Sequence, residues 1–224
     1  MFKNLTKFEK IFLITASLIN IVVAVITKSS LISIVYAVLC SVGSIMMSAA
    51  KIEYYFFELT NCVLYIIISI RQNFYGEVFS SAILIPILIC GLINWIRNKS
   101  ADSDVVQIKT ITKKRAITLI VSQILMMPLY WYIFKSIGSD MALVSAFGFC
   151  LTILSSLFVA NISMYSYIFY LMKDTLLLII WSAPILKGDF SEAPMLVSSF
   201  VYLASDGYGF TNWRRLAKKQ NKGE

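Results

Sequence analysis

The chain has 224 residues, of which 58% are hydrophobic and 14% are charged. Soluble domains are charged at about a quarter of their residues, so this composition excludes a disordered chain and disfavours a water-soluble enzyme. The net charge is +8 and the chain has no histidine, the commonest general base and metal ligand. The basic residues lie between apolar blocks and form no groove, which disfavours nucleic-acid binding. We predict an all-α polytopic membrane protein.

Eight apolar blocks are long enough to cross a bilayer as helices, which takes about 20 residues each. They do not alternate between apolar and polar residues, as the strands of a membrane barrel would. One long polar connection, residues 98–113, separates the fourth block from the fifth. The predicted spans are Phe8–Thr27, Leu31–Ala49, Glu53–Arg71, Gly76–Arg97, Lys114–Lys135, Asp140–Ala160, Ser163–Leu186 and Ser191–Trp213.

The distribution of lysine and arginine predicts the orientation of these spans. With a cytoplasmic N-terminus, fifteen basic residues lie on the inner side, and an even number of spans keeps the basic C-terminal tail there as well. We therefore expect both termini in the cytoplasm, and the +8 charge to reflect topology and contact with anionic lipid. The basic residues of the outer loops are Lys28, Arg71, Lys135 and Lys187.

The ends of the fourth and eighth spans share the pattern GxxNWxR, which begins at Gly91 and again at Gly209, an offset of 209 − 91 = 118. In the third and seventh spans, Asn61 aligns with Asp174 at an offset of 113. We infer two parallel four-helix halves, an arrangement in which transporters bind substrate between the repeats.

Each residue type in this repeated motif has a plain structural interpretation. Trp95 and Trp213 lie at the expected membrane boundary, where aromatic belts form. Asn94 and Asn212 fit either helix caps or hydrogen bonds between helices. The glycines near Asp206 permit close approach or local unwinding of the helix.

Ionisable residues inside spans are candidates for function, because a charge at the bilayer centre costs about 2.5–3.5 kcal/mol on insertion scales. Three helical faces mix an acid or amide with aromatic residues, which suits a small, flat, polar or cationic solute. The alternative is that the acids pair with Lys173 or with a neighbouring helix. The predicted substrate contacts are Asn61, Asp174, Trp181 and Asp206, followed by Glu58, Tyr65 and Tyr202.

We predict neither a cofactor nor a metal site. A P-loop motif is missing from the sequence, which excludes ATP use through such a loop. An intramembrane enzyme would need clustered acids, and Asp102 and Asp104 are close together but without a third acid nearby. The cysteines lack CxxC spacing and are expected to be small apolar packing residues, namely Cys40, Cys62, Cys90 and Cys150.

Several of these motifs, in this order, resemble the PnuC-type family of bacterial vitamin transporters, best known for nicotinamide riboside. The resemblance covers most of the chain. It is carried by Tyr54-Tyr55, Asn61 and Tyr65, then Asn73-Phe-Tyr75-Gly76-Glu77, then Pro86, Gly91 and Asn94-Trp95, and finally Tyr208-Gly209-Phe210 and Asn212-Trp213-Arg214-Arg215.

The resemblance implies a fold related to the SWEET transporters, with two three-helix bundles joined by a linker helix and one additional N-terminal helix. It places the N-terminal helix in residues 1–30, the bundles in 31–97 and 136–215, the loop and linker helix in 98–135, and a basic tail in 216–224. It also implies facilitated diffusion across the bacterial inner membrane by alternating access, trapping of the substrate by a cytoplasmic kinase, and a homotrimer.

The chain departs from the nicotinamide riboside branch of that family in its seventh span. The span has a single tryptophan, Trp181, instead of a WxxW pair, and it carries Lys173-Asp174. Thiamine, a deoxynucleoside and riboflavin therefore remain open as substrates. A further alternative is a vitamin-binding subunit that depends on a separate energising partner, although the two like halves argue against it.

Overall fold

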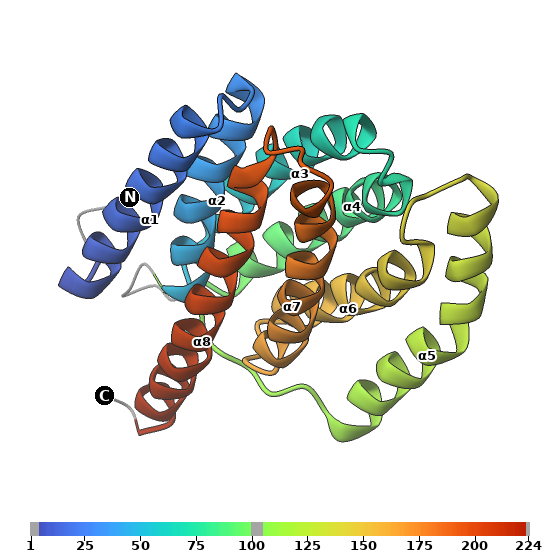
Figure 1. The fold of residues 1–224 in the computed structure, drawn as a ribbon. Helices are drawn as coiled ribbons and strands as arrows, with labels where there is room; N and C mark the ends of the chain where they lie inside the picture. Colours follow the sequence, from blue (N-terminus) through green and yellow to red (C-terminus); the bar gives the residue numbers. More distant parts are fainter. Residues whose placement is uncertain (1–4, 100–104, 223–224) are drawn as a thin grey trace.

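The computed structural model describes residues 5–99 and 105–222, which form eight α-helices and, within those ranges, no β-strand beyond one isolated bridge between Lys99 and Val106. The eight predicted spans are confirmed as helices. Their bounds are α1 Lys7–Ile26, α2 Leu31–Ser48, α3 Tyr54–Arg71, α4 Tyr75–Arg97, α5 Lys113–Ser136, α6 Ala142–Ala160, α7 Ser166–Leu186 and α8 Ala193–Lys222 (Figure 1).

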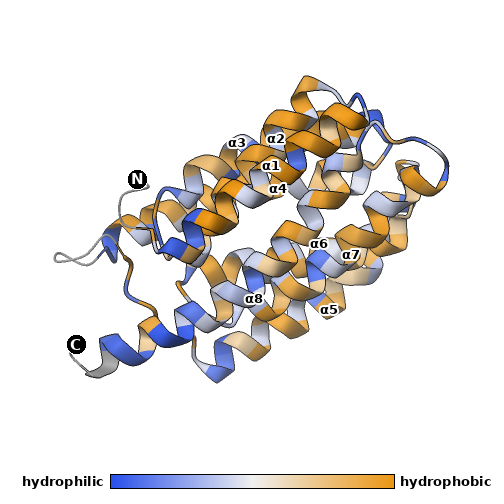
Figure 2. Ribbon diagram, turned by 60° about the vertical axis from the view of Figure 1, so that its left-hand side comes forward, coloured by the Kyte–Doolittle hydropathy of each residue, from blue (hydrophilic) through white to orange (hydrophobic). Residues whose placement is uncertain are grey.

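Six of these helices are long and apolar enough, over their described residues, to cross a membrane. The other two, α3 and α8, contain polar residues that the fold buries, including Asn61 and Asp206. Many large hydrophobic side chains of the helices are exposed. Along the ribbon, hydrophobic residues dominate the helices and hydrophilic residues gather towards the helix ends (Figure 2). The chain is a multi-pass membrane protein.

Six helices close into a ring made of two three-helix bundles. Within the bundles, α2 packs on α3 and α3 on α4, while α6 packs on α7 and α7 on α8. The ring closes because α4 packs on α6 and α8 packs on α2. Outside the ring, α1 lies against α2 and α8, whereas α5 lies against α6 and buries only Phe134 among its own residues (Figure 1).

The two ends of the chain lie at the same end of this bundle. The first turn of α1 lies beside Tyr208 of α8, whose hydroxyl donates to the Glu9 carboxylate at 2.9 Å, and α8 continues beyond it at that end of the molecule (Figure 1). A capping box fixes the start of α1, because the Glu9 backbone N–H donates to the Thr6 hydroxyl at 3.2 Å and the Thr6 N–H donates to the Glu9 carboxylate at 2.7 Å. The Thr112 hydroxyl caps the start of α5 by accepting a hydrogen bond from the Arg115 N–H at 3.4 Å, without the reciprocal bond of a capping box.

The first copy of the GxxNWxR motif caps a helix of the opposite bundle. The Asn94 side-chain amide, on α4, donates to the Ala160 carbonyl at 2.7 Å. The Trp95 indole N–H donates to the Val159 carbonyl at 2.8 Å. Both acceptors belong to the last turn of α6, where carbonyls lack partners within their own helix.

The second copy does the same in the other direction. The Asn212 amide, on α8, donates to the Ser48 carbonyl at 2.9 Å, and the Trp213 indole N–H donates to the Met47 carbonyl at 2.9 Å. Of the two interpretations of the asparagines, the one observed is hydrogen bonding between helices. The prediction of an aromatic belt is wrong, because Trp95 and Trp213 are completely buried and lie 5.7 Å apart between ring centroids.

The geometry also corrects the alignment of the third and seventh spans. Tyr55 stands edge-on to Trp95, and Tyr167 stands edge-on to Trp213, which gives an offset of 167 − 55 = 112. Two residues past the ends of α2 and α6 lie Ala50 and Ile162, and both have a left-handed backbone (φ 56° and 57°). Their offset, 162 − 50, is again 112. The predicted offset of 113 is therefore wrong by one residue.

The connection between the halves is hydrogen-bonded to both of them. The Val106 N–H donates to the Ala50 carbonyl at 3.2 Å, and the Lys109 N–H donates to the Ile162 carbonyl at 2.9 Å. Gln220 binds this segment from α8, donating to the Val106 carbonyl at 3.1 Å. The expected end of the last span at Trp213 is too early, because α8 continues as a helix to Lys222.

Candidate functional site

All six ring helices contribute side chains to a central cavity of about 60 Å³ between the two bundles. Such a volume holds roughly four water molecules, at about 15 Å³ each. It is lined by Tyr36, Glu58, Asn61, Cys62, Tyr65, Glu77, Ser80, Ser81, Leu84, Thr152, Lys173, Leu177 and Tyr202.

A second cavity, of about 10 Å³, adjoins the first and shares Glu58, Lys173 and Tyr202 with it. It lies towards the end of the bundle where α2 ends and α3 begins, because Met47 and Tyr54 line it. Its full lining is Ser44, Met47, Tyr54, Glu58, Tyr170, Lys173, Asp174, Tyr202 and Asp206.

Asn61 is the clearest candidate for a hydrogen bond to a ligand in the central cavity. Its side chain is 2% exposed, and neither its amide nitrogen nor its oxygen has a hydrogen-bond partner among the described residues. A buried amide without partners is costly, since desolvation goes uncompensated. Hydroxyl groups of an incoming solute would satisfy both atoms.

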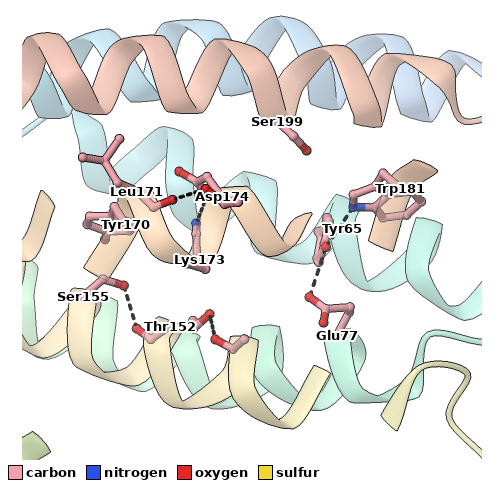
Figure 3. A network of polar contacts seen from close by, with 12 residues as sticks. Tyr65, Glu77, Thr152, Ser155, Tyr170, Leu171, Lys173, Asp174, Trp181 and Ser199 are labelled. Carbon is pink, nitrogen blue, oxygen red and sulfur yellow. Dashed lines mark hydrogen bonds and ion pairs between the residues drawn. The ribbon is translucent and has the colours of Figure 1, made fainter. Parts of the chain in front are cut away.

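Lys173 and Asp174 form an ion pair at the boundary between the two cavities (Figure 3). The Lys173 ammonium lies 2.7 Å from Oδ1 of Asp174. It also lies 5.0 Å from the ring centroid of Tyr170 and 5.2 Å from that of Tyr202, within the range of cation–π attraction. The ammonium is therefore held by one carboxylate and two aromatic faces.

The acidic groups of the site outnumber its one ammonium. Asp174 and Asp206 are buried, and Oδ2 of each has no hydrogen-bond partner within the described part of the chain. Glu58 lines both cavities and the buried Glu77 lines the central one. Four carboxyl groups thus line the two cavities, and Lys173 is the one basic side chain in the same linings, which favours cationic ligands over anionic ones.

Trp181 occupies a different position from the other predicted residues. It is buried behind Tyr65 and does not line either cavity. Its indole N–H donates to the Tyr65 hydroxyl at 3.1 Å, and that hydroxyl donates to the Glu77 carboxylate at 3.2 Å (Figure 3). Trp181 therefore orients Tyr65 and, through it, Glu77.

The comparisons with known proteins agree with this architecture. Residues 30–215 match the family described as nicotinamide mononucleotide transporter. The chain belongs to this family. It is 21% identical, over 226 residues, to the nicotinamide riboside transporter PnuC of Neisseria mucosa, covering 99% of this chain and 86% of that protein. The crystal structure of the vitamin B3 transporter PnuC matches with a TM-score of 0.86 and 21% identity, over 96% of this chain and 94% of that one.

Membership of the nicotinamide mononucleotide transporter family confirms the resemblance found in the sequence. The structural match confirms the predicted all-α membrane fold. The family and both relatives are transporters, as the sequence predicted in preference to an enzyme.

The ring brings together six of the seven predicted contacts, while Trp181 lies behind them. Their contact with a substrate stays a prediction. Sequence reasoning did not select Glu77, Ser80 and Ser81, although their i, i+3, i+4 spacing places them on one face of α4. Thr152, on α6, gave no such signal.

Two further predictions concern clustered acids and the cysteines. Asp102 and Asp104 lie outside the described residues. Among those that are described, no three histidine, cysteine, aspartate or glutamate side chains are grouped closely enough to hold a metal ion. The cysteines are free; Cys62 lines the central cavity and Cys90 is exposed on α4.

Proposed function

We propose that this protein imports nicotinamide riboside or a similarly charged ring compound across the bacterial inner membrane. The observation that carries the proposal is the chemistry of the two cavities, whose linings contain four carboxyl groups, several tyrosines and one lysine. The family and the relative named as a nicotinamide riboside transporter support the same substrate class.

Nicotinamide riboside matches these groups part by part. Its pyridinium ring is a flat cation, which tyrosine faces and carboxylates attract. Its ribose hydroxyls and carboxamide can hydrogen-bond the unpartnered atoms of Asn61 and the hydroxyls of Ser80 and Ser81. The cavity must widen to admit the whole molecule, as expected of a carrier that changes conformation during transport.

The phosphorylated form of the same compound fits less well. Nicotinamide mononucleotide adds a phosphate group with a charge of about −1.5 to −2. That charge would meet the carboxyl groups of Glu58, Glu77, Asp174 and Asp206, and the one cation present is already paired. We therefore expect selection for the riboside over the mononucleotide.

Thiamine is the second candidate, because it too carries a positive charge on an aromatic ring and the same acidic cavity would attract it. Deoxynucleosides and riboflavin are uncharged and gain nothing from the carboxyl groups. These two compounds remain alternatives only because the resemblance to the vitamin transporter family leaves them open.

The mechanism proposed is facilitated diffusion by alternating access, in which the two bundles rock about the central site. A cytoplasmic kinase then traps the substrate by phosphorylation, and the carrier works as a homotrimer.

The excess of lysine and arginine at the end that holds both termini supports a cytoplasmic location for them. The paired bundles favour a self-sufficient carrier over a subunit that needs an energising partner.

A binding and uptake experiment tests the proposal. Detergent-purified protein is titrated calorimetrically with nicotinamide riboside, nicotinamide mononucleotide, thiamine, riboflavin and thymidine, and reconstituted vesicles are assayed for uptake. We expect saturable binding and uptake of the riboside, reduced at least tenfold in Asn61→Ala. The matched control is Thr60→Ala, an exposed position on α3. Absence of binding and uptake of every compound would refute the proposal.

A further inference from the structure

We propose that Lys173 is a built-in counter-ion, which occupies the cation site of the empty carrier and leaves it when a cationic substrate enters. This inference rests on the proposed function. It adds the reason why the carrier, once it has released its substrate, can turn its empty binding site back to the side of uptake. It also assigns the site for the positive charge of the substrate to the cage of Asp174, Tyr170 and Tyr202.

The surroundings of the Lys173 ammonium are those of a bound cation. It has a carboxylate oxygen at 2.7 Å and two tyrosine ring centroids at 5.0 and 5.2 Å. Carboxylates and aromatic faces are the groups that hold a pyridinium or a quaternary ammonium ion in proteins. The cage formed by Tyr170, Asp174 and Tyr202 is therefore a ligand site in which a side chain of the protein itself is the ligand.

The lysine has room and freedom to leave this cage. Its side chain is 14% exposed and lines both cavities, whereas Asp174 beside it is 1% exposed and lines the smaller one. A lysine has a flexible four-carbon stem, so its ammonium can move by several ångströms without any backbone change. Glu58 also lines both cavities and offers the ammonium a second carboxyl partner.

Unpartnered oxygens show that the lysine alone does not satisfy the acids. Oδ2 of Asp174 and Oδ2 of Asp206 are buried and accept no hydrogen bond from an N–H group or a hydroxyl of the described residues, and the two carboxyl groups interact with each other. Both side chains line the smaller cavity. A second positive group therefore has acceptors waiting when it reaches the cage.

The repeat places Lys173 opposite an uncharged residue. At the offset of 112, Lys173 in α7 corresponds to Asn61 in α3, and both line the central cavity. The two bundles are alike in their capping tryptophans, asparagines and tyrosines, yet at this pair of positions one bundle carries an ammonium group and the other a neutral amide. Within the described lining, Lys173 is the only basic side chain.

If one cation replaces the other, the reorientation of the loaded carrier and that of the empty carrier should depend differently on Lys173. With substrate bound, the substrate's charge neutralises the cage, and the carrier reorients whether or not Lys173 is basic. Without substrate, the Lys173 ammonium is the one basic group that the described cavity linings offer to Asp174. An uncompensated buried carboxylate is costly in a membrane interior, so an empty carrier lacking that ammonium should reorient slowly.

The experiment compares two fluxes of labelled nicotinamide riboside in reconstituted vesicles. Net uptake into empty vesicles requires return of the empty carrier, and exchange into vesicles preloaded with unlabelled substrate does not. For Lys173→Met we expect net uptake at least tenfold below wild type, exchange within about threefold of wild type, and a lower calorimetric Kd for the riboside. The matched control is Lys135→Met, because Lys135 also lies over an aromatic ring, that of Trp131, but at the end of α5.

A second variant restores the balance of charge. It keeps the inference testable if Lys173→Met folds poorly. Lys173→Met combined with Asp174→Asn removes both members of the pair, and the ratio of net uptake to exchange should return towards wild type. Lys173→Arg, which keeps the charge, should retain most of that ratio. Two results would overturn the inference. One is an equal loss of net uptake and exchange in Lys173→Met, and the other is a double variant whose ratio of net uptake to exchange stays as low as that of Lys173→Met. Wild-type protein that neither binds nor transports the riboside would instead refute the proposed function.

Discussion

Substituting alanine for Gly209 tests the close packing at the end of the ring where the two tryptophans of the repeated motif lie. A Cβ atom at this position would lie 2.5 Å from Cζ of Tyr167 and 2.7 Å from its hydroxyl oxygen, with Cε1 closer still. The tyrosine cannot swing aside cheaply. It is completely buried, its hydroxyl donates to the Met47 carbonyl at 3.2 Å, and its ring stands edge-on to Trp213 at 5.3 Å.

Gly207 provides the matched control, because it lies two residues earlier in α8 and a Cβ added there meets nothing within 4 Å. Replacing glycine by alanine inside a helix stabilises it by about 1 kcal/mol, and both variants gain this amount. Overpacking costs about 1–3 kcal/mol, and only Gly209→Ala incurs it. We therefore expect Gly209→Ala to be about 1–3 kcal/mol less stable than Gly207→Ala.

The assay is thermal unfolding of detergent-purified protein followed by intrinsic fluorescence. For a chain of this length, the difference corresponds to a melting temperature about 2–12 °C lower for Gly209→Ala than for Gly207→Ala. Tyr167→Ala should cost less stability when it is added to Gly209→Ala than when it is made in wild type, because removing the ring relieves the overpacking at the contacting position. Equal melting temperatures for the two alanine variants would refute the packing described here.

Two further outcomes follow from other contacts. Trp181→Phe removes the indole donor to the Tyr65 hydroxyl, so we expect riboside affinity to fall about three- to tenfold with little change in melting temperature, and unchanged calorimetric affinity would contradict the orienting role. Hydrogen bonds from Ser191 and Gln72 hold the pKa of Asp189, in the loop before α8, below its usual range. A carboxyl group with a lowered pKa stabilises the fold above its usual pKa and loses this contribution as pH falls, so wild type should lose more stability than Asp189→Asn between pH 6 and pH 3. Parallel melting curves for the two proteins across that range would show that this linkage is absent.

The helices could be predicted from the sequence because each block of about 20 apolar residues ends at polar or charged residues. The first span was expected at Phe8–Thr27 and is observed at Lys7–Ile26. The exception is the end of α8, where hydropathy marks the membrane boundary at Trp213 but not the end of the helix. The following residues favour helix and include neither glycine nor proline before position 222, so α8 continues.

The site was harder to predict, because hydropathy gives the depth of a residue but not the direction in which its side chain points. Trp95 and Trp213 lie at the depth of an aromatic belt, yet they face the opposite bundle. Glu77 stands in the first turn of α4, where an acid is ordinarily explained by the helix dipole. Only the packing of α4 on α3 reveals that it faces Tyr65 and the cavity.

The crossed caps make each half of the chain depend on the other for its folding. The tryptophan of α4 caps α6, and that of α8 caps α2, which is the reciprocal pattern of an isologous dimer with the pair Trp95 and Trp213 beside its axis. Either half alone would leave buried indole N–H groups and terminal carbonyls without partners. The duplicated chain is thus a dimer fused into one polypeptide, and it should unfold in a single cooperative step, with neither half stable by itself.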